Sequence, residues 1–274
     1  MNLPLRLGSK GPDVRRVQAA LGEQPDGHFG PLTHAAVLLY QRARGLAPDG
    51  VVGPATWARM EREEGRAPAA PITFSRDLIA KGFPRCVDPA AWAEAFTAAA
   101  ARFPTFSRTG WACIFAKAAT EAGGLTRWDE NLFYTSAAQV KLMFGSRAPD
   151  PAALLRNPRL LGDTVYAHLG GYDGRGLGVI QLTGLANHTA FARDFGLSLP
   201  DARAFMQTIP GAAMTAPWYL EHYGAVDAAN RGDMRAVLAV VAGKTASGLA
   251  GIWTSIHGDQ QMADFKRFEA LLSA

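Results

Sequence analysis

Two glutamates nine positions apart have the residue type and surroundings that suit acid–base chemistry. Glu121 falls at the C-terminal end of a helix predicted over residues 110–121, on the apolar face that also carries Ala118. The helix is stopped by Gly123 and Gly124. Poor hydration on an apolar face and the negative end of the helix dipole both favour a protonated carboxyl group. We therefore expect Glu121 to be neutral, as a general acid must be.

The second glutamate, Glu130, lies in the segment WDENLFY and has polar neighbours at Arg127, Asp129 and Asn131. These neighbours should keep its carboxylate ionised. Two carboxyl groups in opposed environments are what acid–base hydrolysis of a glycosidic bond requires. If the reaction inverts the sugar, the carboxyl groups of Glu121 and Glu130 should lie roughly 6.5–9.5 Å apart to admit a water.

The elements that must position these residues are helical. Apolar residues recur at helical spacing behind an Asp-Pro start and predict a helix over residues 88–103. Later apolar groups around Trp218 and Phe265 have the same character and are expected in the core. The sequence therefore predicts a mainly α fold.

A short internal repeat organises the N-terminal part of the chain. The segment DGHFGPLT at residues 26–33 recurs as DGVVGPAT at residues 49–56. Each copy predicts a turn at Asp-Gly, a short extended piece, and a helix with proline at its first position, Pro31 or Pro54. With one further helix before them, these elements predict a small three-helix domain.

The composition changes between the repeat and the larger remainder. The segment EREEGRAPAAPIT loses periodicity and gathers charged residues, alanine and proline, as linkers do. We predict a small domain over residues 1–62, a linker over 63–74 and a larger domain over 75–274.

The N-terminal pattern resembles a known domain. Its three blocks are LRLGSKGPDVRRVQAAL, PDGHFGPLTHAAVLLYQRARGL and PDGVVGPATW, and together they cover about residues 4–62. They resemble the three-helix peptidoglycan-binding domain that is attached to cell-wall hydrolases. The resemblance implies that this unit holds the wall polymer.

Three later blocks, in order, resemble glycoside hydrolase family 19. They are AKAATEAGGL, DENLFYTSAAQVKLMF and GRGLGVIQLTGLANHTAF, within a resemblance that covers about residues 85–255. That family holds chitinases and the related peptidoglycan-cleaving endolysins of bacteriophages. The resemblance implies a lysozyme-like, α-helical catalytic domain and hydrolysis of β-1,4 glycosidic bonds.

The same resemblance assigns roles to single residues. Glu121 matches the general acid of the family, and Glu130 matches its general base. Gln181 and Thr183 match positions that line the sugar site and help to hold the attacking water. Asn187 matches a substrate-binding asparagine. A hydroxyl group at such a site suits an inverting reaction, which must fix a water opposite the leaving group.

The chain departs from the family pattern at four places. The resemblance makes Arg175 a candidate substrate-binding residue. However, Leu177, Gly178 and Val179 separate Gly174-Arg175-Gly176 from Ile180-Gln181, so either a two-residue insertion displaces Arg175 or Leu177 replaces the arginine. Thr120 stands where the family has histidine, and His188 where it has tyrosine. The late Asn-Gly-Gly block is reduced to Val-Ala-Gly-Lys at residues 241–244.

Two aromatic residues close to Glu130 are further candidates for contact with substrate. Trp128 could stack on a sugar ring, and Tyr134 lies in the same block. The six histidines show no paired zinc-ligand spacing, and the Asp-Gly turns lack the spaced oxygen ligands of a calcium loop. We expect no metal and no cofactor.

The charge balance constrains the partner only weakly. The 274 residues have a formal net charge of +4. Basic residues are not interleaved with aromatics as in nucleic-acid-binding proteins, and no apolar segment reaches the ~18 residues of a membrane span. We expect a monomer that acts on peptidoglycan strands, without nucleic acid or stable membrane insertion. The start of the chain lacks the apolar stretch of a signal peptide, so we expect synthesis in the cytoplasm and action on the cell wall or periplasm after release.

Several alternatives stay open at this point. The catalytic domain could be a chitinase, or the chain could be a non-catalytic wall-binding or phage structural protein with a decayed hydrolase domain. The sequence does not choose between a phage endolysin, an injected toxin and an autolysin, and it does not name the cleaved linkage, the host or the stem-peptide preference.

Overall fold

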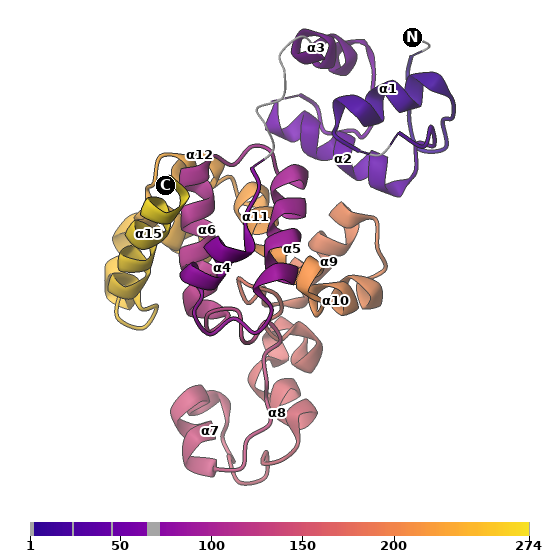
Figure 1. The fold of residues 1–274 in the computed structure, drawn as a ribbon. Coiled ribbons are helices and arrows are strands. Elements are labelled where there is room, and N and C mark those ends of the chain that lie inside the picture. Colours follow the sequence, from indigo (N-terminus) through magenta and orange to yellow (C-terminus); the bar gives the residue numbers. More distant parts are fainter. Residues whose placement is uncertain (1–2, 24, 45, 65–71, 274) are drawn as a thin grey trace.

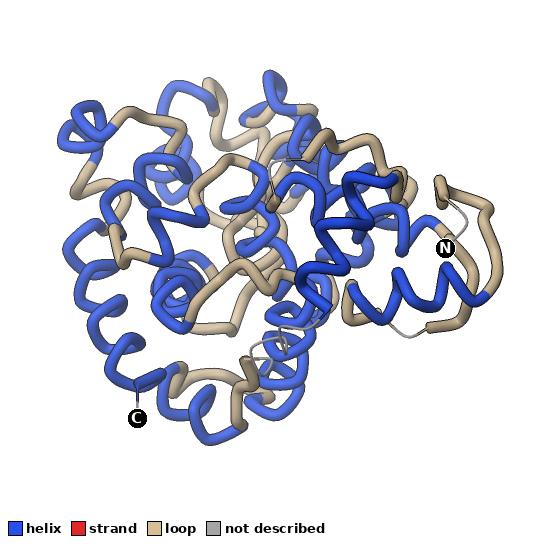
Figure 2. Tube along the Cα trace, turned by 90° about the horizontal axis from the view of Figure 1, so that it is seen from above, coloured by secondary structure: helices blue, strands red, loops and turns tan. Residues whose placement is uncertain are grey.

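The structure is a computed structural model that describes residues 3–23, 25–44, 46–64 and 72–273. Within these ranges the regular elements are α and short 3-10 helices, and extended backbone forms only isolated bridges such as the one between Leu5 and Val52 (Figure 2). The predicted mainly α fold is confirmed. Most of the predicted linker over 63–74 lies outside the described residues, and the predicted domain boundaries stay predictions.

The N-terminal unit contains three helices around a small core (Figure 1). They are α1 (Pro12–Ala20), α2 (Pro31–Ala43) and α3 (Pro54–Glu64). The second and third begin at the two repeated prolines, as the Gly-Pro pattern predicts. The core contains Leu5, Val14, Val17, Phe29, Val37, Val52, Trp57 and Met60.

A buried glutamine in the preceding helix holds each copy of the repeat. Gln41 donates from Nε2 to the Asp49 carboxylate (2.8 Å) and the Val51 carbonyl oxygen (2.9 Å), while its Oε1 accepts from Gly50 N (2.9 Å). Gln18 makes the same contacts, at the same sequence offsets, with Asp26, His28 and Gly27. The Asp-Gly turn is thus fastened at both its side chain and its backbone.

The two turn aspartates give this unit a pH dependence with a defined sign. A backbone N–H donated to each carboxylate, followed by the glutamine amide, lowers the pKa of Asp26 and of Asp49 below the ordinary value of 3.8. A depressed folded-state pKa stabilises the fold above the unfolded-state pKa, and this stability is lost as the pH falls through the folded value. We expect the N-terminal unit to unfold at lower temperature below about pH 4.

The indole N–H signal of Trp57, followed by NMR as the temperature rises, reports the unfolding of the N-terminal unit within the full chain. Changing both aspartates to asparagine should flatten the dependence of its unfolding temperature on pH. An identical pH dependence in the variant would show that the two turns are not responsible.

The larger unit is built on two aromatic-rich helices. They are α5 (Pro89–Arg102), capped by Asp88, and α6 (Arg108–Glu121), capped by Ser107. Helix α6 begins two residues before the predicted 110–121 and is buried continuously from residue 110 to residue 118. The remaining helices around this pair are α4 (Arg76–Gly82), α9 (Leu185–Phe195), α10 (Leu199–Met206), α11 (Ile209–His222), α12 (Val226–Asn230), α13 (Met234–Val241), α14 (Ala246–Leu249), η4 (Ala250–Ile252) and α15 (Gly258–Ser273).

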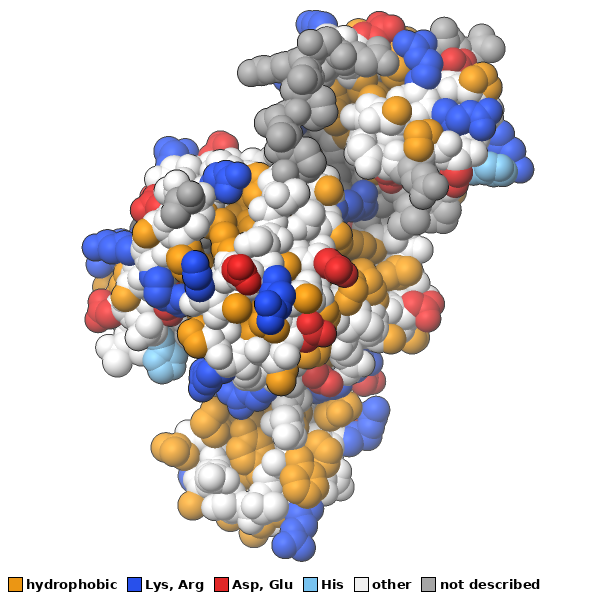
Figure 3. All heavy atoms as spheres, in the orientation of Figure 1, with side chains coloured by type: hydrophobic (Ala, Val, Ile, Leu, Met, Phe, Trp, Pro, Cys, Tyr) orange, Lys and Arg blue, Asp and Glu red, His pale blue; other side chains and the backbone are white. Residues whose placement is uncertain are grey.

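A third, smaller hydrophobic cluster forms a lobe of its own. Its elements are α7 (Ala137–Phe144), η1 (Gly145–Arg147), α8 (Pro158–Val165), η2 (Ala167–Leu169) and η3 (Gly171–Gly174). The cluster contains Leu132, Val140, Phe144, Ala148, Leu154, Leu161 and Val165. Figure 1 shows α7 and α8 projecting from the main body, and Figure 3 shows hydrophobic side chains gathered on this lobe. The sequence did not predict this subdivision of residues 75–274.

Candidate active site

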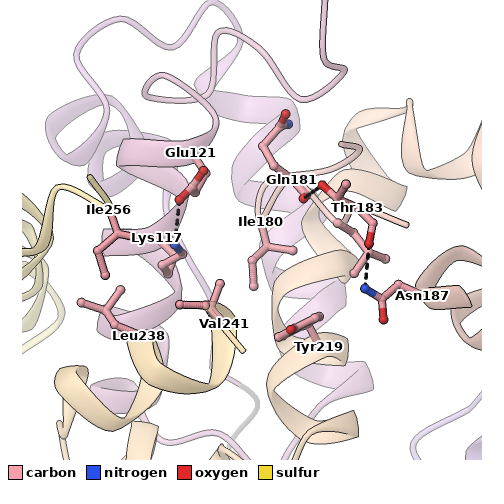
Figure 4. A pocket seen from close by; sticks show the side chains of 12 residues that line it. Lys117, Glu121, Ile180, Gln181, Thr183, Asn187, Tyr219, Leu238, Val241 and Ile256 are labelled. Carbon is pink, nitrogen blue, oxygen red and sulfur yellow. Dashed lines mark hydrogen bonds and ion pairs between the residues drawn. The ribbon is translucent and has the colours of Figure 1, made fainter. Parts of the chain in front are cut away.

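A pocket of about 310 Å³ opens at the C-terminal end of α6. Figure 4 shows Glu121 and Lys117 on one side of it and Gln181, Thr183 and Asn187 on the other. The remaining lining residues, mostly apolar, are Ile180, Leu182, Tyr219, Leu238, Val241, Ala242 and Ile256. The pocket therefore brings together four of the residues that the sequence marks as candidates.

The surroundings of Glu121 differ from the expected ones. Its Oε1 lies 2.8 Å from the ammonium nitrogen of Lys117, one helical turn earlier, and the two form an ion pair. The Lys117 side chain is only 4% exposed, whereas that of Glu121 is 33% exposed. The expected apolar surroundings of the Glu121 carboxyl group are therefore wrong, because a buried ammonium group lies within ion-pair distance of it.

The ion pair predicts a trade-off between stability and activity. Replacing a buried charged group by an apolar one of similar volume is often neutral or stabilising, and Glu121 is exposed enough to be hydrated alone. Lys117→Met should therefore leave the melting temperature unchanged or raised. It should lower kcat roughly 10- to 100-fold, because the Glu121 carboxylate loses the contact that orients it.

Calorimetry and cleavage assays on the same protein sample measure both effects. Lys266→Met, on the exposed surface of α15, is the matched control. A Lys117→Met protein with full kcat would show that the ion pair does not position Glu121.

The opposite wall of the pocket is a loop whose polar side chains hydrogen-bond to groups within the protein. Gln181 has φ of +53°, in the left-handed region, and its carbonyl oxygen accepts from the Thr183 hydroxyl group (2.8 Å). The Thr183 carbonyl oxygen accepts from Asn187 Nδ2 (2.7 Å), and Tyr223 donates its hydroxyl proton to Asn187 Oδ1. Both ends of the Asn187 amide are therefore already used within the protein.

A buried histidine anchors this loop. The ring nitrogens of His188 lie 2.7 Å from the Leu182 carbonyl oxygen and 3.1 Å from the Asp173 carbonyl oxygen. Burial is the largest influence on this ring, and it lowers the pKa of His188. His188, which stands where the family 19 pattern has tyrosine, thus contacts the backbone at both ends of the segment 173–182.

The second glutamate is held by two donors outside the pocket lining. Glu130 accepts from the Tyr166 hydroxyl group (2.7 Å) and from Gly176 N (3.0 Å). Burial, followed by the charge of Glu130, raises the pKa of Tyr166. Both contacts fix the position of the Glu130 carboxyl group. Gly176, which donates to Glu130, packs closely against Gln181 of the pocket wall: a Cβ atom added to Gly176 would lie 2.8 Å from Gln181 Oε1. The predicted carboxyl separation stays a prediction.

Arg175 is buried, and its guanidinium group has partners within the protein. Its guanidinium group forms an ion pair with Asp129, with Nε 3.0 Å from Oδ1, and stacks 4.2 Å from the ring centroid of Tyr172. Leu177 is fully buried in the main core. Neither residue reaches the pocket, so the expected contact between Arg175 and substrate is not supported. Arg175 instead holds the segment before Gly176 against the loop that carries Glu130.

The two aromatic candidates are also used in packing. Trp128 donates from Nε1 to the Gln207 carbonyl oxygen (2.7 Å) and lies edge-to-face with Trp92 at 5.2 Å. Tyr134 packs edge-to-face on Phe144 in the smaller lobe. Neither lines the pocket. These contacts place both rings in hydrophobic clusters and do not support the expected stacking on sugar.

Sequence reasoning missed Lys117, Tyr166 and Tyr223. The spacing of Lys117 and Glu121, four residues apart in one helix, was a signal for the ion pair. The tyrosines carried no signal, because each reaches its partner from a segment 36 residues away.

Among the described residues, no group of three or more His, Cys, Asp and Glu side chains is arranged to hold a metal ion. Cys113 is buried, and burial raises the pKa of its thiol to about 12, so it is no nucleophile at neutral pH. In the same part of the chain no helix has the length and apolarity needed to cross a membrane.

Comparison with known proteins agrees with the two resemblances seen in the sequence, one for the N-terminal unit and one for the larger unit. Residues 10–60 match the family model of a peptidoglycan binding domain. A glycosyl hydrolase family 19 domain-containing protein of Haemophilus influenzae is 32% identical over 124 residues, which make up 41% of this chain. Both resemblances drawn from the sequence are confirmed. The family 19 match spans 61% of the length of that relative.

Solved structures give weaker similarities. Chitinase C from Streptomyces griseus is 17% identical with a TM-score of 0.49, and the match covers 73% of this chain and 93% of that one. A Burkholderia AP3 phage endolysin is 16% identical with a TM-score of 0.36 over 99% of both chains.

One of the four departures from the family 19 pattern lies in the wall of the pocket. Val241 and Ala242 line it where the family has Asn-Gly-Gly, so this part of the wall is apolar. Thr120, in place of histidine, has a buried hydroxyl oxygen without a hydrogen-bond partner among the described residues.

Proposed function

We propose that this protein hydrolyses the β-1,4 glycosidic bonds of peptidoglycan with inversion at the anomeric carbon. One observation carries the proposal. Glu121 faces a pocket whose other wall is formed by Gln181 and Thr183, and Gly176, which packs closely against Gln181, donates its backbone N–H to the Glu130 carboxylate. The N-terminal unit would hold the same polymer.

In the proposed reaction Glu121 protonates the glycosidic oxygen as the bond to the anomeric carbon breaks. Glu130 removes a proton from a water that attacks the opposite face of the sugar. The backbone bonds of Thr183 and Gln181 hold their side chains rigid around that water. To act as the acid, Glu121 must carry a proton in place of its resting ion pair with Lys117.

The expected protein is a monomer that works on glycan strands without metal, cofactor or nucleic acid. These statements belong to the proposal, as does action on the cell wall after release from the cytoplasm.

The test is digestion of purified sacculi by the full chain, with the products analysed by mass spectrometry and NMR. We expect new reducing sugars that first appear as the α-anomer. Freed peptides without reducing sugars would mean an amidase or peptidase, and cleavage of colloidal chitin alone would mean a chitinase. Sacculus binding without product would mean a non-catalytic wall protein. Each of these three outcomes would overturn the proposal.

A further inference from the structure

A second pocket, of about 390 Å³, lies on the other side of the same helix end. Ala119, Thr120 and Gly124, around the last turn of α6, line it. Ile256 lines the first pocket and His257 the second, so the two share walls made by the end of α6 and this turn. The other lining residues are Gly82, Phe83, Pro84, Arg85, Gln260, Asp264 and Arg267.

The charge of this pocket is positive. Asp264 is the acidic residue in its lining, and it is committed to Arg267 (2.7 Å) and to the Gln260 amide (3.1 Å). Arg85 is exposed and donates from Nη2 to the Gly123 carbonyl oxygen (3.1 Å). Among the described residues no ion pair with a carboxylate is found for Arg85. Its remaining donors are therefore available to an anion.

We propose that this pocket binds a carboxylate of the peptide stem of peptidoglycan. The inference rests on the proposed function. It names the feature of peptidoglycan by which the protein would distinguish this substrate from chitin. Every second sugar of peptidoglycan carries a peptide with free carboxylates, whereas chitin is neutral and has none. A guanidinium group recognises a carboxylate through paired hydrogen bonds, and the pocket is large enough for a few peptide groups. Arg85 is the specificity-determining residue in this assignment.

The test compares two forms of one glycan: intact strands, and strands whose stems have been removed with an amidase. For Arg85→Gln we expect KM on intact strands to rise about tenfold, with activity on bare strands unchanged. Arg85→Lys should recover part of the loss because it keeps the charge. Arg231→Gln, an exposed arginine near the other end of α6, removes the same charge and should match the wild type on both.

Direct binding separates this inference from the proposed function. A soluble stem tetrapeptide should bind the full chain, bind more weakly as salt is added, and bind Arg85→Gln weakly or not at all. A peptide with amidated carboxylates should not bind. These readouts need no glycan cleavage, so they hold even if the hydrolase assignment fails.

Two results would overturn the inference. An equal loss of Arg85→Gln activity on intact and bare strands would show that Arg85 only braces the end of α6 through Gly123. Equal binding of the tetrapeptide by wild type and Arg85→Gln would place the peptide elsewhere.

Discussion

Glu121→Gln is expected to lower kcat on sacculi by about 10²- to 10⁴-fold, the range supplied by general acid–base catalysis. The amide has the shape of the acid but no proton acidic enough to give to a leaving oxygen. It can still accept a hydrogen bond from Lys117, which approaches from 2.8 Å in the wild type. Binding of the glycan should therefore persist while the chemical step is lost.

The assay is the rate of release of reducing ends, with sacculus binding measured on the same samples. Glu94→Gln, on the exposed side of α5, makes the same chemical change away from the pocket and should be fully active. If Glu121→Gln lysed sacculi at nearly the wild-type rate, Glu121 would not be the general acid and the proposed mechanism would be wrong.

Glu130→Gln is expected to be similarly inactive, for a reason that the local contacts make specific. The wild-type carboxylate accepts from Gly176 N and from the Tyr166 hydroxyl group. A glutamine can keep both contacts, because its Oε1 can face Gly176 while its amide group donates to a rotated Tyr166 hydroxyl. The substitution thus removes the charge and the basicity but not the anchoring, and we expect a loss of about 10²- to 10⁴-fold in kcat.

Tyr166→Phe is the companion variant for Glu130. It removes one hydrogen bond but leaves the carboxylate, so we expect a loss of only about tenfold. Both variants are measured on bare glycan strands and on sacculi, with thermal unfolding to verify the fold. A Tyr166→Phe protein that is as inactive as Glu130→Gln would mean that the tyrosine itself takes part in the reaction. Full activity of Glu130→Gln would exclude it as the base.

Much of the architecture could be predicted from local patterns. Helices begin at Pro31, Pro54 and Pro89 because proline is preset for the first turn of a helix, and the sequence shows this directly. The end of α6 at Glu121 follows from the glycines behind it. The glutamines that fasten the two turns of the N-terminal unit carry no such local signal. Their role depends on contacts between a helix and a turn eight residues further on.

The sequence by itself determined the helical class, the repeated turns and the two glutamates with their order along the chain, because these depend on neighbours within a few residues. Only the tertiary structure decided that the Lys117 side chain paired with Glu121 is buried. It also decided that Tyr166 donates to Glu130 from a separate lobe and that Arg175 forms a buried ion pair with Asp129. A side chain's burial and charge partner are set by segments that fold against it from far along the chain. The electrostatic state of a site therefore emerges only once those segments are packed.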